Sequence, residues 1–80
     1  MATNEQKFTA LLQDLHELAI YLHGRGDKTL ALSKQFEANA KKDSGNREFD
    51  LKQARMLDYQ HHNWHEGGNL VDKLIKQYES

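Results

Sequence analysis

Apolar side chains recur every three or four residues in the first part of this chain, which is the spacing of one face of an α-helix. Within residues 4–23 they are Phe8, Leu11, Leu12, Leu15, Leu18, Ala19 and Leu22. Thr3 and Gln6 form the Thr-x-x-Gln pattern of a capping box ahead of this run. No segment shows the alternation of β-branched residues that marks a strand. The pattern therefore predicts an all-α fold.

Glycine clusters divide the chain after this first helix. Gly24-Arg25-Gly26-Asp27 predicts a tight connector, because glycine accepts the left-handed conformation that ends helices. Asp27 is a natural N-cap for a second helix over residues 28–42. The short connector implies that these two helices form an antiparallel hairpin.

Two more helices are expected in the second half. Asp43-Ser44-Gly45-Asn46 predicts a turn, and a third helix follows over residues 47–66. Gly67-Gly68 is expected to end it before a last helix over residues 70–79. The expected fold is one all-α domain over residues 1–80. It is a small bundle of three to four helices built on an N-terminal antiparallel helical hairpin.

Composition sets the size of the core and excludes several classes of protein. The chain has 80 residues, a mass of 9.3 kDa and no cysteine, so no disulfide staples a small core. Chains of this kind often complete their core by oligomerising, so a homo-oligomer is expected. A formal net charge of -1 argues against a dedicated nucleic-acid binder. Without an apolar span or a secretory signal, a cytoplasmic protein is expected.

The five histidines form the first candidate site. His61 and His65 are four residues apart, which lets two imidazoles reach one metal ion from one helix face. Asp58 shares that side, so Asp58, His61 and His65 are candidate ligands for Zn²⁺ or Ni²⁺. His16 and His23 are possible sources of a further ligand. The alternatives are solvated histidines, a helix or subunit contact, and a pH-sensitive contact.

The predicted connector carries a second candidate site. Arg25, Lys28 and Thr29 lie at the expected start of a helix, where free N–H groups and the helix dipole favour an anion. Ser33 and Lys34 add a hydroxyl and an ammonium group one turn later. The alternative is an ordinary interhelical turn with solvated charges.

Aromatic residues flank the histidines, and no catalytic set accompanies them. Trp64 and Tyr59 are expected in the core or at a subunit contact, although a tryptophan can also anchor a protein partner or stack on a base. No nucleophile stands beside a base, so no catalytic residue and no cofactor is assigned. The protein is not expected to be an enzyme.

One stretch has a family resemblance. Arg25…Lys28-Thr29-Leu30-Ala31-Leu32-Ser33-Lys34…Phe36-Glu37-Ala38 resembles the second-helix signature of small phage proteins, the cyclic-nucleotide sponges that counter CBASS and Thoeris immunity. The resemblance implies an oligomer in the host cytoplasm that sequesters a phosphorylated signalling nucleotide at subunit junctions without chemistry. It would transfer phosphate contacts to Arg25, Lys28, Thr29, Ser33 and Lys34.

Two other functions fit the same residues. One is a protein–protein interaction module, of the inhibitor or immunity type, acting through a Trp64/His face. The other is a metal-binding helical bundle. The expected partners are a second copy of the chain, a phosphorylated small ligand or another protein. Neither a membrane nor a nucleic-acid polymer is expected as a partner.

Overall fold

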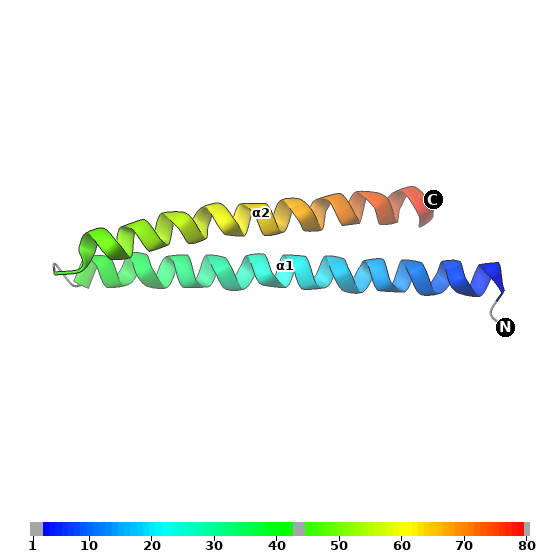
Figure 1. The fold of residues 1–80 in the computed structure, drawn as a ribbon, viewed down its shortest axis with the longest axis horizontal. Helices are drawn as coiled ribbons and strands as arrows, with labels where there is room; N and C mark the ends of the chain where they lie inside the picture. Colours follow the sequence, from blue (N-terminus) through cyan, green and yellow to red (C-terminus); the bar gives the residue numbers. More distant parts are fainter. Residues whose placement is uncertain (1–2, 43–44, 80) are drawn as a thin grey trace.

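A computed structural model describes residues 3–42 and 45–79, which form two long helices lying antiparallel, side by side (Figure 1). Helix α1 is Asn4–Lys42 and helix α2 is Arg47–Glu79. The molecule measures 62 × 21 × 12 Å, so it is one helix thick. No strand occurs in the described residues, which confirms the prediction of an all-α fold. Neither helix has a described stretch that is both apolar and long enough to cross a membrane.

The predicted helix breaks at the glycines are wrong. Residues 24–27 and 67–68 lie inside α1 and α2, so the four predicted helices are two continuous ones. No described glycine has the positive φ that a helix-ending glycine adopts. The chain has no proline to interrupt either helix. A glycine inside a helix costs about 1 kcal/mol relative to alanine, and packing between the helices offsets that cost here.

The helix starts agree with the sequence. The backbone N–H of Gln6 donates to Oγ1 of Thr3 at 3.1 Å, and the N–H of Thr3 donates to Oε1 of Gln6 at 2.9 Å. This confirms the predicted capping box. Helix α2 begins at Arg47 as predicted, and the N–H of Asp50 donates to the carbonyl of Asn46. Asp43 and Ser44 of the predicted turn lie outside the described residues.

The two helices pack along an unbroken seven-residue repeat, here called the seam. Its residues are all buried or half-buried and recur at alternating intervals of three and four. On α1 they are Leu12, Leu15, Ala19, Leu22, Gly26, Thr29, Ser33, Phe36 and Ala40. On α2 they are Asp50, Ala54, Leu57, His61, Trp64, Gly68, Val71 and Ile75. This is the pattern of an antiparallel coiled coil, and it passes through Gly26 and Gly68 without a shift.

Gly26 and Gly68 make room for two histidine rings. A Cβ built on Gly26 would lie 2.7 Å from the ring of His65, and one on Gly68 would lie 2.7 Å from the ring of His23. Atoms do not approach that closely, so each ring occupies the space that a side chain would need. The spacing His-x-x-Gly occurs once on each helix, and each histidine packs on the glycine of the other.

Alanine substitutions at Gly24 and Gly26 test this arrangement. Gly24→Ala should raise the free energy of unfolding by about 0.5–1 kcal/mol, because alanine favours a helix and nothing lies within 4 Å of the new Cβ. Gly26→Ala should lower it by about 1–3 kcal/mol, because the ring of His65 must move. Urea unfolding followed by far-UV circular dichroism measures both. Destabilisation by Gly24→Ala would contradict a continuous α1.

Candidate functional site

The seam separates two flanks of opposite chemistry. With Ala19 and Gly68 at heptad position a, positions e and b of both helices lie on one side of the seam, and positions g and c on the other. The first flank, here called the histidine face, carries His16, His23, Asp27, Asp58, His62, His65, Asp72 and Glu79. The second, the apolar face, carries Leu11, Leu18, Tyr21, Leu32, Phe49, Met56, Leu70 and Leu74.

Three histidines each place Nε2 near a carboxylate of the other helix. Nε2 of His23 lies 2.9 Å from Oδ2 of Asp72. Nε2 of His65 lies 3.3 Å from Oδ1 of Asp27. His16 pairs in the same way with Glu79, near the open end of the hairpin. A carboxylate accepts a hydrogen bond, so Nε2 is the donor in the hydrogen bonds of His16 and His23, whereas His65 only approaches Asp27.

His23 and His65 meet between the helices through their other ring nitrogens. Their Nδ1 atoms are 3.1 Å apart, and the ring centroids are 5.3 Å apart. For nitrogens this close, the ring centres are farthest apart when the two nitrogens point directly at each other. The observed centroid distance is close to that limit, so each Nδ1 points at the other. With both Nε2 atoms protonated, two Nδ1 lone pairs would face each other. Two ring nitrogens that face each other in this way can serve as a pair of ligand atoms.

The third imidazole beside this pair is His61, which lies in the seam. Its ring meets that of His65 edge-on at 5.5 Å between centroids. Its Nε2 lies 3.4 Å from Asp58, and its Nδ1 is buried without a hydrogen-bond partner among the described residues. His62 is exposed and lies 3.9 Å from the same carboxylate.

The predicted metal ligands are not gathered at one point. Asp58 lies with His61 and His62, whose candidate ligand atoms are within 4.8 Å of one another. His65 turns instead to His23 and Asp27 on α1. Metal binding by Asp58, His61 and His65 stays a prediction; His65 keeps a ring contact with His61, while its nitrogens face His23 and Asp27.

The predicted phosphate contacts are also spread over several sides of α1. Thr29 and Ser33 are buried in the seam, where the Thr29 hydroxyl donates to the Arg25 carbonyl at 2.7 Å. The Ser33 hydroxyl donates across the helices to the carbonyl of Ala54, also at 2.7 Å. Both hydroxyls are therefore engaged within the fold.

The cationic residues of that set divide between the two flanks. By heptad position, Arg25 and Lys28 lie on the side of the apolar face, and Lys34 lies on the side of the histidine face. Residues 24–27 are inside α1, so the helix start that was expected to offer free N–H groups is absent. Phosphate binding by these residues stays a prediction, but it no longer has the support of free N–H groups at a helix start.

Trp64 is a seam residue whose ring contacts side chains on the apolar-face side. The Arg25 guanidinium lies over its ring at 5.4 Å, and Tyr21 meets it edge-on at 6.4 Å. Protein binding through a Trp64/His face stays a prediction. Trp64 is half-buried between the helices, and its expected place at a subunit contact stays a prediction; Tyr59 is 70% exposed.

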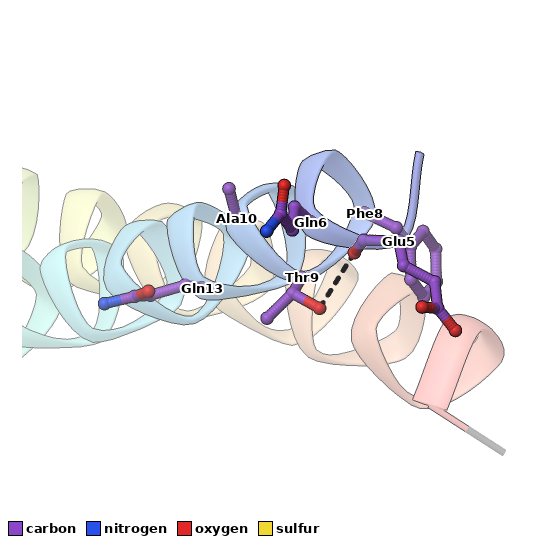
Figure 2. Close-up of a pocket in the computed structure, with 6 residues that line it drawn as sticks. All are labelled: Glu5, Gln6, Phe8, Thr9, Ala10 and Gln13. Carbon is purple, nitrogen blue, oxygen red and sulfur yellow. Dashed lines mark hydrogen bonds between the residues drawn. The ribbon is translucent and has the colours of Figure 1, made fainter. Parts of the chain in front are cut away.

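A surface hollow of about 600 Å³ lies near the start of α1, far from the histidine pair. Figure 2 shows its six lining residues, which all come from α1: Glu5, Gln6, Phe8, Thr9, Ala10 and Gln13. The Thr9 hydroxyl is already engaged with the Glu5 carbonyl. A ligand there would be contacted by one helix only, so this hollow is not the candidate site.

The fold and its central cluster define a histidine-containing antiparallel helical hairpin. No protein-family model matches the chain, and no curated protein or solved structure gives a significant match.

Sequence reasoning missed the partners of the histidine pair, Asp27 and Asp72. The signal for the pair was the repeated His-x-x-Gly spacing at His23 and His65. In an antiparallel pair of helices that end at Lys42 and begin at Arg47, such repeats fall opposite each other. Reading the glycines as helix ends hid that relation.

NMR of the imidazole nitrogens tests the assignment of donors. In metal-free protein at neutral pH, long-range ¹H–¹⁵N spectra should show Nε2 protonated in both His23 and His65, because each faces a carboxylate. Asp72→Asn should alter the ring signals of His23 and leave those of His62 unchanged. A His23 that carries its proton on Nδ1 alone would contradict the assignment.

Proposed function

We propose that the protein is a non-catalytic interaction module that acts as a self-associated hairpin, with two copies forming a four-helix bundle. The observation that carries this proposal is the apolar face. Eight of the twelve exposed large hydrophobic side chains gather on that one flank of the hairpin. Apolar area gathered in this way favours association.

The surface area of the hairpin supports the same proposal. Its accessible surface is 6474 Å², whereas a compact monomer of 9.3 kDa exposes about 5,000 Å². Its radius of gyration is 18.3 Å, against about 12 Å for a compact chain of 80 residues. A stable interface buries about 800 Å² on each partner. The excess surface is large enough to supply such an interface.

A second copy is the partner that the chemistry favours. A two-fold pair buries the same patch on both copies, so one face covers the other. The net charge of -1 per chain opposes this association very little. Two antiparallel hairpins packed face to face make a four-helix bundle with a core from the apolar faces and polar histidine faces outside.

Lysine substitutions on the two flanks test this face. Leu18→Lys should weaken dimerisation at least about 10-fold, because a buried leucine contributes about 1.5–3 kcal/mol and 1.4 kcal/mol is tenfold in affinity. The matched control is Ile20→Lys, which alters an exposed apolar residue on the other flank and should leave the dimer intact. Analytical ultracentrifugation of untagged protein measures both dissociation constants.

A monomeric wild type at high micromolar concentration would contradict the proposal. Equal weakening by both substitutions would also contradict it, because it would place the contact elsewhere. Far-UV circular dichroism confirms that both variants remain helical.

A second candidate function, sequestration of a phosphorylated nucleotide, draws support from the cluster around Trp64. Arg25 lies over Trp64, Tyr21 meets the same ring, and Lys28 lies one turn further on that side. An aromatic ring stacks on a base, and the cations pair with phosphate. In the proposed bundle this cluster lies at the junction between the two copies, because Tyr21 is part of the apolar face.

Charge removal on opposite flanks of α1 tests nucleotide binding. Arg25→Ala and Lys28→Ala should abolish binding of a cyclic dinucleotide, and Lys34→Ala should retain it, because Lys34 is on the opposite flank. Isothermal titration calorimetry measures the affinity, and native mass spectrometry of gently purified protein detects a retained ligand. No binding by the wild type, or equal loss in Lys34→Ala, would contradict this function.

A further inference from the structure

We propose that His23 and His65 together bind a divalent transition-metal ion such as Zn²⁺ through their Nδ1 atoms, joining the two helices at the middle of the hairpin. This site is separate from the apolar face and does not depend on self-association. Imidazole nitrogen is a preferred ligand of Zn²⁺, Cu²⁺ and Ni²⁺.

The distance between the two ligand atoms suits such an ion. Two imidazole nitrogens bound to tetrahedral Zn²⁺ at 2.0–2.1 Å lie about 3.3 Å from each other. The Nδ1 atoms of His23 and His65 are 3.1 Å apart. Because each Nδ1 points at the other ring, both rings must turn until their lone pairs are directed at an ion beside the line that joins the two nitrogens. The side chains are 32% and 29% exposed, so water can reach the remaining coordination positions.

A carboxylate lies beside the Nε2 atom of each ring, the nitrogen that the proposed site leaves free of metal. Asp72 lies 2.9 Å from Nε2 of His23, and Asp27 lies 3.3 Å from Nε2 of His65. Metal-bound histidines commonly donate their second ring N–H to a carboxylate, which fixes the ring and keeps the other nitrogen unprotonated. Here His23 makes this hydrogen bond to Asp72, and the Asp27 carboxylate lies near Nε2 of His65.

Each histidine ring also packs against a glycine of the opposite helix, which restricts its position. Each ring lies over a glycine of the opposite helix, Gly26 under His65 and Gly68 under His23. A site built on two helices with packed rings is more precise than one on mobile side chains. By contrast, Asp58 and His62 of the neighbouring acidic and histidine cluster are mostly exposed and come from one helix.

Zinc titration of tag-free, chelator-treated protein tests the proposal. Calorimetry should show one Zn²⁺ per chain, and Zn²⁺ should raise the melting temperature measured by circular dichroism. His23→Ala and His65→Ala should each lose both effects. Asp72→Asn should weaken the affinity by about 10- to 100-fold, because it removes the carboxylate that orients His23.

His62→Ala is the matched control, because it removes an exposed histidine of the neighbouring cluster. It should bind Zn²⁺ like the wild type. Loss of binding in His62→Ala with retention in His23→Ala would overturn the proposal and place the ion at Asp58, His61 and His62. A wild type that binds no Zn²⁺ would also overturn it. Helical content in the presence of chelator shows that each variant is folded.

Discussion

The packing of a histidine ring on a glycine of the opposite helix is the contact on which the rest of this structure depends. It occurs twice, with His65 over Gly26 and His23 over Gly68. A larger residue at either glycine would push the ring out and separate the helices locally. The glycines lower the intrinsic helix propensity of α1 and α2, but they also allow the two helices to pack more closely. The gain from close packing outweighs the loss of propensity.

That close approach determines how the polar groups are distributed. Because the rings fill the space between the helices, their nitrogens are fixed in direction, and Asp27 and Asp72 complete a row of four ionisable side chains across the hairpin. The opposite flank receives large apolar side chains that the hairpin alone does not cover. One side of the molecule is therefore specialised for charge and hydrogen bonding, and the other for apolar contact.

Local signals in the sequence predicted local structure well. The Thr3–Gln6 capping box, the start of α2 at Arg47 and the all-α class follow from short-range patterns, and the structure has them. The long-range arrangement was not predictable in the same way, because a glycine pair indicates a helix end unless something packs against it. The seven-residue spacing through Gly26 contained that information. The partners of His65 could not be predicted from the sequence, because they depend on the register between the two helices.

The hairpin topology has a consequence for how the molecule forms and opens. His23 and His65 are 42 residues apart in sequence, yet every layer between them and the turn joins residues that are closer along the chain. The helices can therefore zip together from the turn outward, each layer shortening the loop that the next must close. Opening should follow the reverse order. The backbone amide protons around the Phe8–Tyr78 contact, at the far end, should then exchange with solvent first. Those around the Ser33–Ala54 hydrogen bond should be among the last to exchange.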